Sequence, residues 1–298
     1  DECAGRAPGT AGGRRARRHV IDAIRDAGLD PLEHDVPGCL GANEIAALPG
    51  DIDRWVMVAA HYDHLGVIDG ETYRGADDNA AAVAILVEVA RGLAAERAEG
   101  RGVIVAAFDA EEPPYFMSAA MGSEHYARHP TVALESIDLM LCMDLVGHAL
   151  GPRGLPSAVR DTVFALGAER SLGTRELLED IDEEGVVVRV ADAALVPPLS
   201  DYAAFWERRR PFVFLTNGRS RIYHTPEDVP SELSWSKMGA TARWLERVVR
   251  ATCSRAAAPF AFVDQTDDLS TLDSMMALLS ELAAVSPQAQ MGLRVATA

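Results

Sequence analysis

Residues 55–64 read WVMVAAHYDH, an apolar run that changes at His61 into side chains able to bind metal. A strand covered on both faces has such near-continuous apolarity, whereas a strand with one solvated face alternates apolar and polar residues. We therefore predict a buried strand over residues 55–60. Similar runs predict further buried strands at residues 103–108 (VIVAAF), 139–143 (LMLCM) and 212–215 (FVFL).

Helical segments alternate with these strands. Helical spacing of apolar residues is found at residues 14–27, about 79–97 and 234–252. Strands and helices in this order form a mixed, mostly parallel sheet between two helix layers. The 298 residues, 48% of them hydrophobic, suffice for one large core. We expect a single-domain, three-layer α/β/α fold over residues 1–298.

The C-terminal part carries a further helical signal, which predicts a helical extension over about residues 265–298. An apolar stripe supports it, made of Leu272, Met275, Met276, Leu279 and Leu282. We interpret the stripe as a packing face, with a dimer interface as the alternative. We expect the last dozen residues to form a tail.

The charge balance is strongly acidic, with 45 acidic against 28 basic residues and a formal net charge of −17. Nucleic acid and anionic membrane surfaces would be repelled, so neither is an expected partner. No apolar run reaches the ~20 residues of a membrane span. The chain as given shows no signal peptide, which favours a cytoplasmic location, with secretion as the alternative.

The four cysteines form no C-x-x-C pair, so any metal must be held by histidine and carboxylate. Cys142 lies inside an apolar run and is expected to be a core thiol. Cys3 and Cys39 lie in loop-like segments, where the sequence leaves a disulfide open.

Candidate ligands follow the predicted strands, where open α/β sheets place their binding sites. His61 follows the first strand, and Asp63 lies on the same side of an extended chain, where it can orient the imidazole. Asp77 and Asp78 precede the helix of residues 79–97. Helix capping explains one acid there, whereas two crowd negative charge that a dication would relieve.

Two adjacent acids, Glu111 and Glu112, follow the second strand. Neighbouring side chains on an extended segment point in opposite directions, so both cannot bind one ion without distortion. One can bind metal while the other acts as a general base on a water. Asp144 follows the third strand, and His224 beside Tyr223 follows the fourth. This set of histidines and carboxylates suits a pair of Zn²⁺ ions, with Mn²⁺ or Co²⁺ as alternatives.

These motifs, in this order, resemble the M28 family of zinc aminopeptidases, from Gly5-Arg6 and Gly9-Thr10 to the helix after His224. The resemblance implies the zinc-exopeptidase, phosphorylase/hydrolase-like fold and hydrolysis of the N-terminal bond of small peptides. It implies His61 and Asp144 as outer ligands of one zinc, Glu112 and His224 as those of the other, and Asp78 as the bridge.

The resemblance also implies roles for other residues. Glu111 matches the general base, which takes the proton of the attacking water and returns it to the leaving amine. Asp63 matches the partner of His61, and Tyr223 matches a hydrogen-bond donor to the developing oxyanion. A cis peptide is implied between Asp78 and Asn79.

Two segments depart from the family pattern. Many members follow the paired glutamates with a short Gly-Leu-x-Gly-Ser turn, whereas here residues 113–121 (PPYFMSAAM) precede Gly122-Ser123. We expect four loop residues to line the substrate pocket and favour an apolar N-terminal side chain, with loop packing as the alternative: Tyr115, Phe116, Met117 and Met121. In Ser200-Asp201-Tyr202, Tyr202 stands where His is common.

Other activities share this motif set. A glutaminyl cyclase-type acyltransferase is the nearest alternative, and carboxypeptidase or dipeptidase specificity is another. Family members that act as non-catalytic binding modules lose ligands, whereas all five ligand positions and the base are filled here. The sequence leaves the oligomeric state and the preferred N-terminal residue open.

Overall fold

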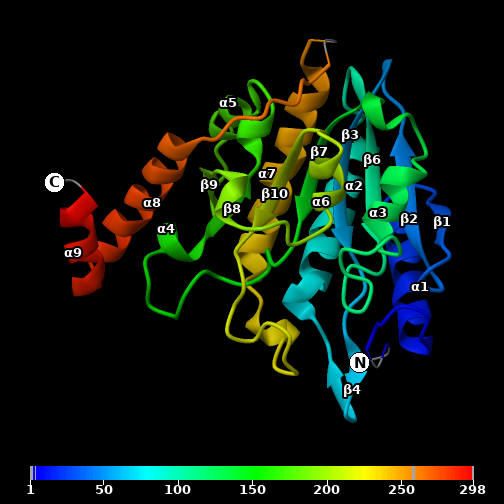
Figure 1. Ribbon diagram of the computed structural model, residues 1–298, viewed down its shortest axis with the longest axis horizontal. Coiled ribbons are helices and arrows are strands. Elements are labelled where there is room, and N and C mark those ends of the chain that lie inside the picture. The colour runs from blue at the N-terminus through cyan, green and yellow to red at the C-terminus, as the bar shows by residue number, and fades with distance from the viewer. Residues whose placement is uncertain (1–2, 4, 257–258, 297–298) are drawn as a thin grey trace.

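The structure is a computed structural model and describes residues 3, 5–256 and 259–296. An eight-stranded sheet forms its centre, with the strand order β1-β2-β6-β3-β7-β10-β8-β9 (Figure 1). The strands are Leu32–Val36 (β1), Gly41–Leu48 (β2), Ile52–His61 (β3), Arg101–Phe108 (β6), Ile137–Met143 (β7), Thr162–Leu166 (β8), Val187–Ala191 (β9) and Phe212–Thr216 (β10). A separate antiparallel ribbon consists of Gly66–Ile68 (β4) and Glu71–Tyr73 (β5).

The four predicted strands form the middle of the sheet. There β6, β3, β7 and β10 run parallel to one another, while β2 and β8 pair antiparallel with the two outer strands of this group. The prediction of a mixed, mostly parallel sheet is therefore confirmed. Because the central strands run parallel, their carboxyl ends meet at one edge of the sheet.

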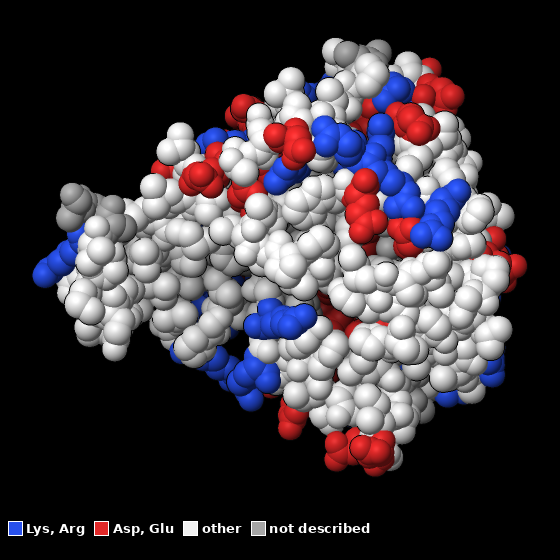
Figure 2. Space-filling view, viewed as in Figure 1, with Lys and Arg blue, Asp and Glu red and all other residues white. Residues whose placement is uncertain are grey.

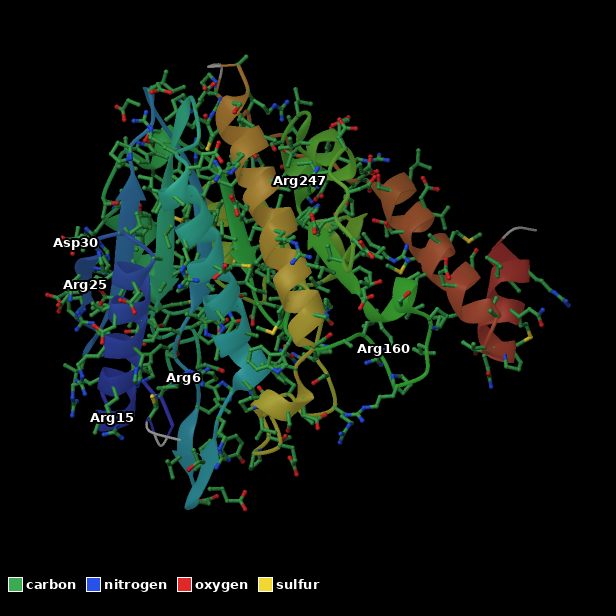
Figure 3. The ribbon with its side chains drawn as sticks, turned by 180° about the vertical axis from the view of Figure 1, so that it is seen from behind. Arg6, Arg15, Arg25, Asp30, Arg160 and Arg247 are labelled. Atoms are coloured by element: carbon green, nitrogen blue, oxygen red, sulfur yellow. The ribbon has the colours of Figure 1, made fainter. Side chains whose placement is uncertain are left out.

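Helices cover both faces of the sheet, and each central strand contributes alternate residues to two cores. Val56 and Val58 of β3 belong to the core under α1, α2 and α7, while Met57 and Ala59 belong to the core under α3 and α6. Figure 3, seen from behind, shows α1, α2 and α7 in front of the sheet. The three-layer prediction is confirmed. The helices are Ala11–Asp26 (α1), Ala81–Ala95 (α2), Gly122–Arg128 (α3), Ser157–Arg160 (α4), Thr174–Glu179 (α5), Ala203–Glu207 (α6), Trp235–Ser254 (α7), Asp268–Ala283 (α8) and Pro287–Ala296 (α9).

The starts of two helices differ from the predicted boundaries for local reasons. Helix α1 begins three residues earlier than predicted, because the Thr10 side chain accepts a hydrogen bond from the Gly13 N–H and caps it. Helix α2 begins two residues later. The preceding turn, Ala76–Ala80, leaves the helical conformation at Asp78 and Asn79.

The C-terminal helices α8 and α9 project from one side of the molecule (Figure 1). Helix α8 packs on the edge strand β9, where Ser274 Oγ donates to the Val190 carbonyl at 2.5 Å and Thr271 Oγ1 accepts from the Asp192 N–H. The predicted tail is wrong for most of its length, because α9 occupies its described part. Ser286 accepts a hydrogen bond from the Ala289 N–H, and Pro287 opens the helix, two ordinary start signals.

All four cysteines are free, and the alternative of a disulfide between Cys3 and Cys39 is not realised. Cys142 is fully buried on β7, as predicted. In the described part of the chain, no helix combines the length and apolarity needed to cross a membrane.

Candidate metal centre

The candidate ligands meet at the carboxyl edge of the parallel strands. His61 is the last residue of β3, Asp144 directly follows β7, and Glu111 and Glu112 lie in the loop after β6. His224 comes from the loop after β10. Together with Asp78, which precedes α2, these residues come from five segments far apart in the sequence.

A first cluster consists of His61, Glu111 and Asp144, all buried. Nε2 of His61 lies 3.5 Å from Asp144 Oδ1 and 3.8 Å from Glu111 Oε2. Neither ring nitrogen of His61 has a hydrogen-bond partner among the described residues, and neither does Asp144 Oδ1. Buried polar atoms without partners are costly, and a cation held between His61 Nε2 and Asp144 Oδ1 would satisfy both, while His61 Nδ1 faces Asp63. The residues present therefore fit a metal ion.

A second cluster consists of Asp78, Glu112 and His64, all buried, together with His224. Nε2 of His224 lies 3.2 Å from both Glu112 Oε2 and Asp78 Oδ2. The other oxygen of Asp78, Oδ1, faces His61 at 3.6 Å. Asp78 thus directs one oxygen toward each cluster, which is the orientation that a bridging ligand requires.

His64 is part of the second cluster, although the sequence analysis gave it no role. Its Nδ1 lies 2.7 Å from Glu112 Oε1, and both side chains are buried. The contact fixes the carboxylate of Glu112 with the oxygen Oε2 turned to His224. The sequence signal was present in the motif of residues 61–64, but nothing there indicated which acid His64 would meet.

Asp63 supports both clusters. Its two carboxylate oxygens accept the N–H groups of Glu111 and Glu112, each at 3.1 Å, and Oδ1 lies 3.4 Å from His61 Nδ1. One buried carboxylate therefore positions the histidine of the first cluster and the backbone of both glutamates.

Two other residues hold the backbone around Asp78. Asp228 accepts the N–H of Asp77 at 2.8 Å and that of Asp78 at 3.1 Å. Arg6 donates to the carbonyls of Tyr62 and Gly75 at 2.8 Å and to that of Asp78 at 3.1 Å. The cis peptide implied between Asp78 and Asn79 is present.

Asp77 connects this turn to the loop that carries Asp144. Its Oδ1 accepts the N–H groups of Gly147 and His148 at 2.8 and 3.0 Å, and its Oδ2 lies 2.6 Å from His148 Nδ1. Of the two adjacent acids, Asp78 thus faces the clusters and Asp77 fixes the loops.

Three residues without the freedom of glycine adopt positive φ at the centre. These are Ala110, Leu145 and His224, with φ of 59°, 57° and 54°. This left-handed conformation is strained for such residues and costs ~1–3 kcal/mol each, which the surrounding contacts must offset. Ala110 precedes Glu111, Leu145 follows Asp144, and His224 is itself a candidate ligand. The strained backbone therefore occurs where it orients side chains of the metal centre.

Burial and charge separate the two glutamates electrostatically. Burial, together with Asp144, raises the pKa of Glu111 well above its ordinary value, although His61 opposes the shift. Burial would also raise the pKa of Glu112, but hydrogen bonds from His224 and His64 outweigh it, and the pKa is lowered. Such a divergence is typical of a proton-transferring acid beside a permanently charged one.

A cavity of about 540 Å³ opens over the two clusters. Its polar side includes Glu111, Tyr223 and His224. Its apolar wall consists of Phe116, Leu145, Leu166, Val196, Leu199 and Phe214. Figure 2 shows acidic atoms at the floor of a crevice near the centre of this face.

The four loop residues expected at the substrate pocket are placed differently from one another. Phe116 lines this cavity. Tyr115 packs instead against a small cluster around Val36. Met117 and Met121 line a different cavity, of about 120 Å³, beside α6. The Pro113–Pro114 bond, like that between Asp78 and Asn79, is cis.

Tyr202 is buried away from the cavity and stacks on Phe212 and Phe214. Its hydroxyl donates to the Pro197 carbonyl at 3.2 Å. The preceding Asp201 is fully buried near the first cluster, and burial raises its pKa to about 7, with His61 opposing the shift.

The sequence model described as Peptidase family M28 matches residues 43–249, more than half of the chain. The chain belongs to Peptidase family M28. All the ligands predicted above, and Glu111, lie inside the matched range.

One curated relative of this M28 chain is YfbL of Escherichia coli (strain K12), an uncharacterized protein. It is 28% identical over 252 residues, which cover 75% of this chain and 76% of YfbL.

Two solved structures show the same fold. The Legionella pneumophila LapA aminopeptidase is 17% identical, with 85% of this chain and 68% of that chain covered and a TM-score of 0.68. The Porphyromonas gingivalis glutaminyl cyclase is 20% identical, with 84% and 94% covered and a TM-score of 0.65. An M28 fold therefore accompanies a peptidase in one neighbour and a cyclase in the other.

Proposed function

We propose that this M28 chain is an aminopeptidase that uses two metal ions. Zinc is the preferred candidate, and manganese and cobalt are the alternatives. The observation that carries the proposal is the orientation of Asp78, whose two oxygens face His61 and His224 in separate clusters. Nε2 of His61 adds support, because it faces the first cluster without a hydrogen-bond partner and can bind a cation.

Divalent ions bound to these side chains would lower the pKa of a water and polarise the scissile carbonyl. Glu111 accepts the proton of the attacking water, whose oxygen bonds to the carbonyl carbon. The C–N bond then breaks, and Glu111 delivers the proton to the leaving amine. Asp63 holds the backbone of Glu111 throughout.

Tyr223 is proposed to donate a hydrogen bond to the oxyanion that develops on the carbonyl oxygen. It lines the cavity, and its ring stacks on His224 with 3.8 Å between the centroids. Burial, together with the charge of Asp78, raises the pKa of the phenol, so the hydroxyl keeps the proton that it must donate.

The apolar wall of the cavity supports a substrate with an apolar N-terminal side chain, and the free amine would lie near the carboxylates of the clusters. Leucine, lysine and glutamate anilides should therefore be hydrolysed in that order of kcat/KM. Glutamate as the best of the three would contradict the assignment of the cavity.

The proposal is tested most simply on a pair of peptides that begin with Leu and with Gln. An aminopeptidase releases the free first amino acid from both. A cyclase, the activity of one structural neighbour, would instead release ammonia from the Gln peptide and leave its N-terminus blocked. Release of ammonia without free glutamine would replace the proposal by the cyclase, and free C-terminal residues would replace it by a carboxypeptidase.

A further inference from the structure

A second cavity, of about 820 Å³, lies beside the reaction cavity. Its walls come from residues 148–153 after β7, residues 219–222 after β10 and residues 231–234 before α7. Arg219 lines both cavities, so they adjoin at this residue. The proposed reaction does not use this second cavity.

The second cavity is basic, although the whole chain is acidic. Arg153, Arg160, Arg219 and Arg221 line it, against one carboxylate, Glu232. Within the described chain, neither Arg153 nor Arg219 pairs with an acid, and Arg221 lies 3.7 Å from Glu232 in an exposed contact. In Figure 2, basic side chains border a hollow in the lower half of the face, where Figure 1 draws the loops before α4 and α7.

Two of these arginines are oriented by the chain itself. Arg160 donates from Nη1 to the carbonyls of Gly151 and Pro152 at 3.3 and 2.8 Å. The Arg219 guanidinium lies over the Tyr223 ring, 4.5 Å from its centroid. Because a guanidinium has five N–H donors, each arginine keeps donors for an anion. A planar, partly fixed guanidinium matches a carboxylate in particular.

The second cavity lies close enough to the reaction cavity for the leaving portion of a peptide to reach it. In an aminopeptidase the first residue occupies the reaction cavity, and the rest of the peptide must extend beyond the scissile bond. Each further residue adds at most about 3.5 Å. A cavity that begins at Arg219 is thus within reach of the next one or two residues.

We propose that the second cavity binds a carboxylate of the peptide's leaving portion, so that the preferred substrates are short peptides with a free C-terminus or with an acidic residue after the scissile bond. This inference rests on the proposed aminopeptidase function. The arginines would attract an anionic substrate that the acidic surface of this protein would otherwise repel.

The test compares Leu-Gly-Gly with its C-terminal amide. The wild-type protein should prefer the free acid by about five- to tenfold in kcat/KM, as expected for partly exposed ion pairs. In the double variant Arg153→Gln/Arg221→Gln, the ratio of acid to amide should fall to about one. The matched control is Arg247→Gln on α7 (Figure 3), whose arginine pairs with Glu183 and which should keep the wild-type ratio.

Because each ratio is measured within one protein, differences in folding or metal content cancel. Leu-Glu-Gly-amide identifies the source of the carboxylate: a rate near that of the free acid assigns the cavity to either carboxylate, and a rate near that of the amide restricts it to the C-terminus. Equal rates for Leu-Gly-Gly and its amide in the wild type, or an unchanged ratio in the double variant, would overturn the inference.

Failure of the aminopeptidase function can be distinguished from failure of the carboxylate site. If leucine anilide and both peptides are left intact, the aminopeptidase assignment fails. Calorimetric binding of Gly-Gly-Gly and its amide then tests the cavity alone. Tighter binding of the acid that is lost in the double variant retains the carboxylate site, and equal binding removes it.

Discussion

Single residues explain why adjacent acids in this chain perform different tasks. Glu111 belongs to the cluster of His61 and is buried, while Glu112 is fixed between His64 and His224. The loop after β6, with Ala110 in the left-handed conformation and a bend at Glu112, directs the two carboxylates to different clusters. The same division separates Asp77 from Asp78.

Replacing Glu111 by glutamine should abolish peptide hydrolysis while leaving metal binding largely intact. The amide keeps the size of the side chain but cannot accept the proton, and loss of a general base costs about 10² to 10⁴ in rate. The measurements are kcat on a leucine peptide and zinc content by mass spectrometry. Glu176→Gln, on the exposed part of α5, is the matched control. More than a tenth of wild-type activity in Glu111→Gln would refute its role as the base.

The sequence predicted which residues belong to the candidate metal centre, but it did not predict the hydrogen bonds between them. His61 and Asp144 directly follow apolar runs, so the pattern marks them, whereas His224 lies further along, in the loop after β10. The contact between His64 and Glu112 joins residues 48 apart, and that between Asp77 and His148 joins residues 71 apart. Such contacts exist only after the strands have paired, so no local pattern records them.

At the level of elements, the turn before α2 and the loop after β7 are fixed to each other. Asp77 accepts two backbone N–H groups of that loop. Helix α7 adds Lys237, whose Nζ donates to the His148 carbonyl at 2.7 Å, and Asn217 donates to the same carbonyl. Three elements therefore determine where Asp144 lies relative to Asp78.

Asp77→Asn should weaken metal binding, although Asp77 faces neither cluster. The amide cannot serve both the backbone N–H groups and His148 Nδ1–H as acceptors, so the loop of Asp144 loosens. Supporting residues of metal ligands typically contribute about 10- to 100-fold in affinity. Competition with a chelator measures the zinc affinity, and Asp22→Asn on the exposed face of α1 serves as the control. An unchanged affinity in Asp77→Asn would show that the loops hold without this contact.

The buried Lys237 predicts a pH dependence of stability. Burial lowers its pKa from 10.5 to about 7, with Asp77 opposing the shift. Between pH 7 and 10.5 the unfolded chain therefore binds a proton that the folded chain does not, so stability rises with pH.

From pH 7 to 9, Lys237 should raise the free energy of unfolding by roughly 2 kcal/mol. Lys237→Met should lack this increment, which urea unfolding of both proteins at the two pH values measures. If the two proteins gain equally between pH 7 and 9, Lys237 is charged in the folded state and the prediction is wrong.

The long elements were predictable, and the errors lie at their ends. Apolar runs over β3, β6, β7 and β10 and helical spacing over α2 and α7 are strong signals, because burial on two faces or on one face demands them. The start of α2 was missed because Asp78 and Asn79 leave the helix to reach the clusters. The expectation of a tail over the last dozen residues was wrong because Met291, Leu293 and Val295 recur at a spacing of two rather than at helical spacing. Ser286 and Pro287 nevertheless marked a helix start.

The whole molecule places its site at one edge of the sheet and its C-terminal helices at another. Helix α8 covers β9, the last strand of the sheet, through the contacts of Thr271 and Ser274. Exposed sheet edges promote association between chains. The order of strands across the sheet could not be derived from the sequence, since it depends on which strands pair over long distances.

A chain that ends after Thr266 should therefore be less stable and more prone to associate. Loss of about 1–2 kcal/mol corresponds to a fall of roughly 2–3 °C in Tm for a chain of this size. Calorimetry and light scattering measure the two effects. A chain that ends after Ala284 keeps α8 and should lose less than half as much. Equal Tm values for the full chain and the chain that ends after Thr266 would mean that α8 does not stabilise the sheet.

The central claim is a pair of metal ions joined by Asp78. Anomalous scattering from crystals grown with zinc and measured at the zinc absorption edge tests it most directly. The predicted result is two peaks, one at His61 and Asp144 and the other at Glu112 and His224, both within bonding distance of Asp78. A single peak, a peak away from these side chains, or none would contradict the account.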